Sequence, residues 1–589
     1  MKKETKKNSW LPLSKKEAEQ RAWNELDIIL FSGDAYIDHP SFGVGLIGRV
    51  LEKQGFKVAI VAQPNWQDDL RDFKKFGKPR LFFGVSSGNM DSMVNHYTAN
   101  LRLRSTDAYT PNNKAGFRPD RATTVYSQIL RKIYPDSPII IGGIEASLRR
   151  LTHYDYWSNK LRPSILAESN ADLLVYGMGE KPIKEIAKLL DKGIKISEIR
   201  NTQQTAFLSE KENIISDKRW ENITLNSHKE CLKSKLSFAK NFKIIEIESN
   251  KLYSNSRLIQ QIDEKMIVVN PAYSNLTEKE LDEIYQLPFT SLPHPKYNKR
   301  GKIPAFEMIK FSVNSHRGCF GGCSFCTISA HQGKFISSRS EKSILNEIDM
   351  IAEMPEFKGH LSDIGGPSAN MYKMAGIDLS ICEKCKRPSC IFPSICNNLE
   401  TNHENLLNIY RKAKNHPKVK KATIGSGIRY DLFFNKETKN YTKSAYNYLI
   451  ELIKEHVSGR LKVAPEHVSD KVLKTMRKPS FNLFLKLKKT FDEINKKHNL
   501  KQQIIPYFIS SHPTSERSDM ASLASKTKEL NFQLEQVQDF TPTPMTLATV
   551  MFYSGYDPYS LKKVYTAKSK SEKLAQRDYF FWYKKGRNK

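Results

Sequence analysis

Three cysteines in a short glycine-rich loop are the residues of this chain best suited to chemistry. They are Cys319, Cys323 and Cys326, in the string RGCFGGCSFC, and their spacing is C-x3-C-x2-C. Three thiolates close together suit a cubane [4Fe–4S] cluster and leave its fourth iron open to a small molecule. A zinc loop is the alternative, with a fourth ligand from His316 or His331. The preceding strand-like run, MIKFSVNS, favours the cluster, because catalytic groups of a βα barrel lie at strand ends.

This loop and several strings around it resemble the radical S-adenosylmethionine (SAM) superfamily, and within it the YgiQ-type proteins. The strings are IKFSVNSHRGCFGGCSFC, SRSEKSILNEI, SDIGGPSANMY, LKVAPEH, IPYFISSHP, SGDAYIDHPSFG, SSGNMDSMVNHYTA and GGIEASLRRLTHYDYWS. The resemblance implies that the cluster binds SAM and cleaves it reductively, and that the 5′-deoxyadenosyl radical abstracts hydrogen from a substrate. It implies a reducing electron donor such as flavodoxin or ferredoxin. It assigns neither a substrate nor a catalytic residue of the protein.

Further positions match places where radical SAM enzymes contact SAM. The string SDIGGPSAN stands where these enzymes often have Gly-Gly-Glu, with proline in place of the acid and Asp363 as a candidate substitute. The strings IGSGIRYD and VAPEH end later strand-like runs. For each position a turn or a polar group at the core edge is the alternative. The residues that we expect to bind cofactor are Gly365, Gly366, Ser426, Arg429 and Glu466.

A second cysteine group follows in the string ICEKCKRPSCIFPSIC. Its members are Cys382, Cys385, Cys390 and Cys396. Four close cysteines in a reducing compartment indicate a metal-stabilised loop. A structural zinc ion and an auxiliary [4Fe–4S] cluster fit this spacing equally well, and a set of free thiols is the third interpretation.

The apolar runs predict a two-part α/β scaffold for these loops. LDIILFSG, FKVAIVAQP, RLFFGVSSG, SPIIIGGIEA and ADLLVYGMGE are short, rich in aliphatic residues, and separated by amphipathic stretches. They predict a doubly wound parallel sheet, so residues 21–200 form a Rossmann-like domain, comparable to the cobalamin-binding-like domain before many radical SAM barrels. The string GVGLIG lies too far beyond its strand for a dinucleotide site, and we interpret its glycines as close helix–strand packing.

The remaining segments follow from composition and periodicity. Residues 1–20 are expected to form an N-terminal tail, residues 201–300 a polar connector, and residues 561–589 a basic C-terminal tail. Six apolar runs between residues 301 and 560 alternate with helical patterns, which predicts a partial (βα)6 radical SAM barrel with a cysteine-rich insert at 376–400. The DxHxxG cobalamin motif is absent and His39 has the wrong spacing, which argues against cobalamin as a cofactor.

The charge balance leaves two alternative functions open. The chain has 94 basic and 63 acidic residues, a net charge of +31, and such a field favours polyanions, with RNA as a candidate partner. One alternative is therefore an RNA-modifying, methylthiotransferase-like radical SAM enzyme. The other is a non-catalytic protein that binds zinc or nucleic acid. The sequence has neither a secretory signal nor an apolar run of membrane length, so we expect a cytoplasmic protein without membrane contact.

Overall fold

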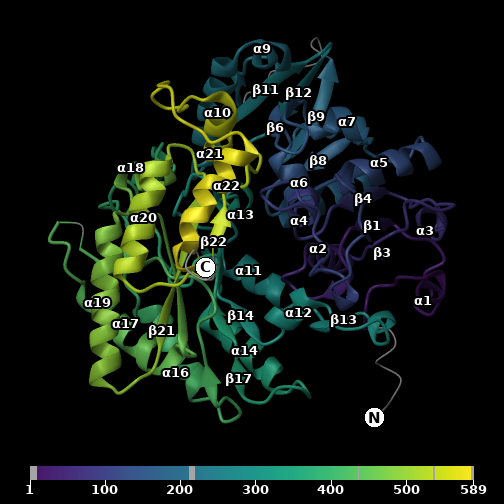
Figure 1. Cartoon of the computed structure of the whole chain (residues 1–589). Coiled ribbons are helices and arrows are strands. Elements are labelled where there is room, and N and C mark those ends of the chain that lie inside the picture. The colour runs from purple at the N-terminus through teal and green to yellow at the C-terminus, as the bar shows by residue number, and fades with distance from the viewer. Residues whose placement is uncertain (1–8, 211–218, 436, 535–536, 585–589) are drawn as a thin grey trace. The chain divides into compact units, whose positions relative to one another are not determined.

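The computed structural model describes residues 9–210, 219–435, 437–534 and 537–584, and the chain divides into two compact units (Figure 1). The N-terminal unit is built from Met1–Asn241, Tyr253–Ser274 and Glu283–Lys310. The C-terminal unit is built from Phe242–Leu252, Asn275–Asp282 and Phe311–Lys589. The two units are described separately.

The five strands predicted in the N-terminal unit are present, and they lie side by side in parallel. Their bounds are β1 Ile28–Ser32, β3 Val58–Ala62, β4 Phe82–Ser86, β5 Ile139–Ile141 and β8 Leu173–Val175. The order across the sheet is β3-β1-β4-β5-β8. Every residue of β1 and β3 is buried, as expected for continuous apolar runs in a sheet whose two faces are covered.

The order of these strands places a switch point between β1 and β4. The chain passes from β1 to β3 on one side of β1, and then returns to β4 on the other side. Loops that leave neighbouring strands in opposite directions open a crevice at the carboxyl edge of the sheet, where open α/β sheets bind their ligands. The loops after β1 and β4 therefore border the crevice in which this unit is expected to bind a ligand.

The sheet continues into residues 201–300, which differs from our prediction of a polar connector. Four further strands complete a nine-stranded mixed sheet in the order β10-β11-β12-β9 beside β8. Their bounds are β9 Thr205–Glu210, β10 Glu221–Thr224, β11 Ser256–Ile262 and β12 Lys265–Val269. The strands carry short apolar runs such as KMIVV, and the abundant Lys and Asn around them obscured the strand pattern. Part of the predicted connector, residues 211–218, lies outside the described residues.

The first helix after β1 explains the glycines of GVGLIG. Helix α2 spans Gly43–Glu52. A Cβ atom on Gly45 would lie 2.7 Å from the backbone oxygen of Ile37, and one on Gly48 would lie 2.4 Å from the Leu11 side chain. These glycines therefore permit close packing of the helix, as we predicted.

We predict that Gly45→Ala lowers the free energy of unfolding by about 1–3 kcal/mol, because its methyl group meets backbone that cannot rotate away. Urea unfolding followed by circular dichroism measures this change. Gly43→Ala is the matched control, because its Cβ would lie 3.8 Å from Asn89, an ordinary contact. Equal stability of the two variants would contradict the packing interpretation.

The C-terminal unit contains strands within all six runs predicted there. Their bounds are β14 Ser312–Asn314, β17 His360–Leu361 with β18 Asp363–Gly365, β19 Lys421–Ala422, β20 Arg460–Glu466, β21 Gln503–Ser510 and β22 Val537–Asp539. The pairs β14–β18, β17–β19, β20–β21 and β21–β22 are parallel, and a parallel bridge joins Ile428 to Val463. The pairings follow chain order, as a partial barrel requires, and the complete barrel stays a prediction.

Helices alternate with these strands in the C-terminal unit (Figure 1). They are α14 Glu341–Ala352, α16 Glu404–Lys414, α17 Lys443–Glu451, α18 Asp470–Met476, α19 Phe481–Lys497, α20 Arg517–Glu529, α21 Leu547–Ser554 and α22 Lys570–Arg577. Among the residues that the structure describes, no helix combines the length and apolar character needed to cross a membrane.

The described parts of both predicted tails are folded. Leu11 is fully buried in the core of the N-terminal unit, and the Ile60 amide donates to the Pro12 carbonyl at 2.9 Å. In the C-terminal segment, the Gln576 side chain donates to the Ser515 carbonyl at 2.6 Å, and Phe580 is fully buried. The basic composition of these segments concealed the few apolar residues that attach them to the cores. Residues 1–8 and 585–589 lie outside the described structure.

Candidate functional site

The cysteine loop of the C-terminal unit follows strands β14 and β15 (His316–Arg317), and its backbone depends on glycine. Gly318 and Gly322 have φ angles of +86° and +60°, in the left-handed region that favours glycine. A Cβ on Gly318 would lie 2.3 Å from the Phe335 carbonyl oxygen, and one on Gly322 2.5 Å from that of Pro388. The loop therefore curls against neighbouring backbone in a way that a residue with a side chain would prevent.

The three thiols of this loop lie near one another and are half-buried. Burial raises the pKa of Cys326 to about 12, and the charges of Cys323 and Cys319 raise it further. Burial also raises the pKa of Cys319, against the opposing effect of the Arg429 charge. Cys319 and Cys326 therefore favour the thiol form unless a metal centre takes the place of the proton.

Arg429 is fixed beside the loop by Asp431. Its Nη1 donates to the Cys323 sulfur at 3.2 Å, while Nε and Nη2 donate to the Asp431 carboxylate at 3.0 and 2.6 Å. Burial acts to raise the pKa of Asp431, but the charge and hydrogen bonds of Arg429, together with the Lys478 charge, outweigh it and lower that pKa. Our sequence reasoning missed Asp431, although it follows Arg429 by two residues in IRYD.

Glu466 also faces this loop. It ends β20 with a φ of +71°, and its negative charge contributes to the raised pKa of Cys326. Burial raises the pKa of Glu466 itself, partly offset by Lys478, whose Nζ lies 3.8 Å from the carboxylate. Sequence reasoning also missed Ser324, whose hydroxyl lies 3.0 Å from Nε2 of the buried His512.

The other three predicted cofactor residues meet at neighbouring strand ends. The Ser426 hydroxyl donates to Asp363, and the Gly425 amide donates to the same carboxylate at 2.8 Å. A Cβ on Gly365 would lie 3.0 Å from the Ser426 hydroxyl. A Cβ on Gly366 would lie 2.4 Å from the His316 ring, so glycine is required there for packing. Cofactor binding by these residues stays a prediction.

The donor chemistry of the loop fits an iron–sulfur cluster. Three half-buried thiols lie in one loop, and a guanidinium donates to one of them. Within the described residues, no three ligating side chains are gathered closely enough to hold a single metal ion. A cubane cluster needs a wider spacing of its ligands than a single metal ion does, because each thiolate binds a separate iron.

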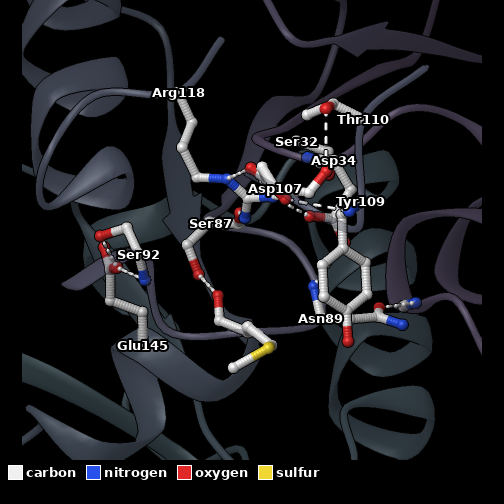
Figure 2. Close-up of polar contacts among 12 residues, drawn as sticks. Ser32, Asp34, Ser87, Asn89, Ser92, Asp107, Tyr109, Thr110, Arg118 and Glu145 are labelled. Atoms are coloured by element: carbon white, nitrogen blue, oxygen red, sulfur yellow. Dashed lines mark hydrogen bonds and ion pairs between the residues drawn. The ribbon is translucent and has the colours of Figure 1, made fainter. Parts of the chain in front are cut away.

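A second candidate site lies at the switch point of the N-terminal unit, where Figure 2 shows a buried polar cluster. Arg118 is 2% exposed and joins Asp34 at 2.8 Å to Asp107 at 3.0 Å. Its Nη1 donates to the Ser87 carbonyl at 2.8 Å, and the Asn89 amide donates to Asp34 at 2.7 Å. The cluster thus ties the loop after β1 to the loop after β4.

Sequence reasoning missed this cluster as well. Asp34 and Asn89 follow strand ends in the strings FSGD and SSGN, which is the signal that could have revealed them. Arg118 and Asp107 lie in a long loop without a recognisable motif. Burial raises the pKa of Asp34 to about 6, and the Arg118 charge opposes this effect without reversing it.

We predict a pH-dependent stability difference between the wild type and Asp34→Asn. A carboxyl whose pKa is raised by folding binds more protons when folded, so its contribution to stability is lost as the pH rises. The melting temperature of Asp34→Asn relative to wild type should therefore rise between about pH 4 and about pH 7. Differential scanning calorimetry measures this trend, and a constant difference would contradict the raised pKa.

Comparison with known families agrees with the class that the cysteine loop defines. The family model described as Radical SAM N-terminal matches residues 10–312, and a domain of unknown function (DUF3362) matches residues 535–582. The match covers about half of the chain and, with the C-x3-C-x2-C loop that follows it, defines a radical SAM protein.

Relatives at high identity specify the family. A UPF0313 protein of Bacteroides thetaiotaomicron is 58% identical over 99% of this chain and 95% of its own length. A UPF0313 protein of Porphyromonas gingivalis is 58% identical over 98% of this chain and 90% of its own length. A UPF0313 protein of Methanocella arvoryzae is 47% identical over 96% of this chain and 92% of its own length. The chain belongs to the UPF0313 family of radical SAM proteins. The predicted radical SAM resemblance is confirmed.

Two solved structures are similar to this chain at low identity. The radical SAM methyltransferase TsrM of Kitasatospora setae, with cobalamin and a [4Fe–4S] cluster bound, has a TM-score of 0.46 at 12% identity, covering 88% of this chain and 77% of its own. The cobalamin-dependent SAM radical enzyme OxsB has a TM-score of 0.49 at 11% identity, covering 96% of this chain and 57% of its own. Likenesses at these scores carry no argument about the activity of this chain.

They do correct our expectation about cobalamin. We took the absence of a DxHxxG motif as an argument against this cofactor, yet both of these solved structures contain cobalamin. The absence of the motif therefore does not exclude cobalamin, and the expectation was wrong.

Proposed function

We propose that this protein is a radical SAM enzyme whose [4Fe–4S] cluster is held by Cys319, Cys323 and Cys326. The observation that carries the proposal is the glycine-rich loop with three half-buried cysteines, in which Arg429 donates to one of the sulfurs. A cluster with SAM bound at its open iron supplies reductive cleavage of the sulfonium C–S bond and, through it, hydrogen abstraction from a substrate.

The side chains around the loop have separate tasks in this proposal. Arg429 stabilises negative charge on the Cys323 sulfur, and Asp431 holds the guanidinium in the orientation that allows this. Glu466 lies near Cys326 and is suited to accept a hydrogen bond from the amino group of SAM. Burial of the loop excludes water from a reactive intermediate.

The glycine-rich strand end supplies a further part of the proposed cofactor site. Gly365 and Gly366 present backbone without side chains, and Ser426 offers a hydroxyl that Asp363 holds in place. The substrate, RNA as a partner, and flavodoxin or ferredoxin as electron donor stay predictions. They do not affect the assignment of the cluster cysteines.

Formation of 5′-deoxyadenosine tests the proposal. The protein, reconstituted with iron and sulfide without oxygen and then reduced with SAM present, should form 5′-deoxyadenosine. Cys323→Ala should abolish it, because an iron of the cluster loses its ligand. Cys231→Ala is the matched control, since Cys231 is buried in the N-terminal unit beside the Asn241 amide. Unchanged cleavage by Cys323→Ala would refute the cluster assignment.

Arg429→Lys tests the task given to the guanidinium. Lysine keeps a positive charge for Asp431 but cannot contact the sulfur and the carboxylate together. We expect 5′-deoxyadenosine formation to fall by about 10–100-fold while iron content stays at the wild-type value. A wild-type rate would show that the contact with Cys323 does not assist the cluster.

A further inference from the structure

The second cysteine group surrounds a buried lysine that has no carboxylate partner. Lys334 is 1% exposed, and its Nζ donates to the Arg387 carbonyl at 2.7 Å and lies 4.0 Å from the Cys385 sulfur. Across the described residues, no carboxylate lies within ion-pair distance of this ammonium. A buried charge is costly unless an opposite charge compensates it, so an anion is expected at the sulfur side of Lys334.

The four cysteines of this loop lie close enough to provide that anion. The Cys385 sulfur lies 4.0 Å from Lys334 Nζ, and Cys390 and Cys396 pack against the same apolar cluster. The Cys396 amide donates to the Cys390 carbonyl at 2.8 Å, and the Cys385 amide donates to the Cys382 carbonyl at 3.2 Å. The loop therefore folds back and brings its sulfurs toward one interior.

A neutral donor also points at this group of sulfurs. The Asn398 amide donates to the Cys382 sulfur at 3.4 Å and to the Asp378 carbonyl at 2.7 Å, which fixes its orientation. Gly376 has room only for hydrogen, because a Cβ there would lie 2.4 Å from the Cys382 sulfur. N–H donors directed at sulfur are the hydrogen bonds that stabilise and tune iron–sulfur centres.

We propose that Cys382, Cys385, Cys390 and Cys396 hold a second iron–sulfur cluster, in which every iron has a protein ligand. A tetrathiolate centre carries the net negative charge that the buried Lys334 requires. A cubane suits an all-sulfur donor set of this kind, because each of the four thiolates binds a separate iron. With four thiolates the centre has no open iron, so it does not bind SAM.

Hydrogen bonds join this loop to the first cysteine loop within the C-terminal unit. The Cys390 amide donates to the Phe320 carbonyl at 3.1 Å, and the Ser389 hydroxyl donates to the Gly321 carbonyl at 2.8 Å. The residue before Lys334, Gly333, accepts from the Cys319 amide at 3.1 Å. Cys319, Cys390 and Cys396 pack against one apolar cluster around Phe320 and Met371. The loop of the proposed second cluster thus stabilises the position of the loop that carries Cys319, Cys323 and Cys326.

Metal and sulfide content of the full chain tests the proposal. After reconstitution with iron and sulfide in the absence of oxygen, the wild type should hold about eight irons and about eight acid-labile sulfides. The double variant Cys385→Ala/Cys390→Ala and the single variant Cys323→Ala should each retain about four irons. Cys231→Ala is the control and should retain the wild-type content.

The outcomes separate this proposal from the proposed function. About four irons in the wild type, or about one zinc per chain that the double variant loses, would overturn the second cluster and leave the first intact. Full iron content in Cys323→Ala would instead overturn the first assignment. If the double variant does not fold, Lys334 provides the deciding measurement.

Lys334→Met removes a positive charge beside the second cluster, and the reduced state of a cluster gains most from such a charge. We expect a more negative reduction potential for that cluster in a redox titration followed by electron paramagnetic resonance, with the iron content unchanged. Lys334→Arg should restore the wild-type potential. An unchanged potential in Lys334→Met, or only one reducible cluster in the wild type, would refute the proposal.

Discussion

Charge compensation around buried sulfur is the constraint on which the rest of the C-terminal unit depends. Thiols removed from water stay protonated, and a thiolate or a metal–thiolate centre in the same place needs positive charge or hydrogen-bond donors nearby. The unit supplies both, with Arg429 at Cys323 and Lys334 at Cys385. Each cation is itself held, Arg429 by Asp431 and Lys334 by a backbone carbonyl.

Parallel strands make this compensation possible because they bring distant parts of the chain to one edge. Cys323 and Arg429 are more than a hundred residues apart. Cys323 lies beyond β14, which pairs in parallel with β18, and Arg429 lies beyond β19, which pairs in parallel with β17. Glycine provides the space between them. A Cβ on Gly321 would lie 2.6 Å from Arg429 Nη1, so the guanidinium can approach the sulfur only across a bare backbone. The strand topology therefore brings Arg429 near the cysteine loop, and Gly321 allows its guanidinium to come within hydrogen-bond distance of the Cys323 sulfur.

The N-terminal unit also compensates buried charge, but with carboxylates in place of thiolates. Its switch point holds Arg118 between two carboxylates, all of them buried, and burial raises the pKa of Asp34. Glycine again allows two loops to approach each other, since a Cβ on Gly33 would lie 2.4 Å from the Ser87 backbone oxygen. Buried ion pairs of this kind fix the geometry of loops more than they add stability, because desolvation offsets most of the attraction. The result is a defined carboxyl edge, where folds of this class accommodate ligands.

The sequence by itself determined the cysteine loop, the five parallel strands of the first unit and the strand runs of the second, since these depend on local spacing and short-range periodicity. It could not assign residues 201–300, because strands of four to seven residues within polar surroundings are recognised only when a neighbouring strand pairs with them. Nor could it indicate that Asp431 orients Arg429, that Lys334 lies unpaired among four cysteines, or that Arg118 joins two loops. Those are contacts between residues far apart along the chain or without a motif. Only the tertiary structure decides them, because the energy of a buried charge depends on which groups surround it in space.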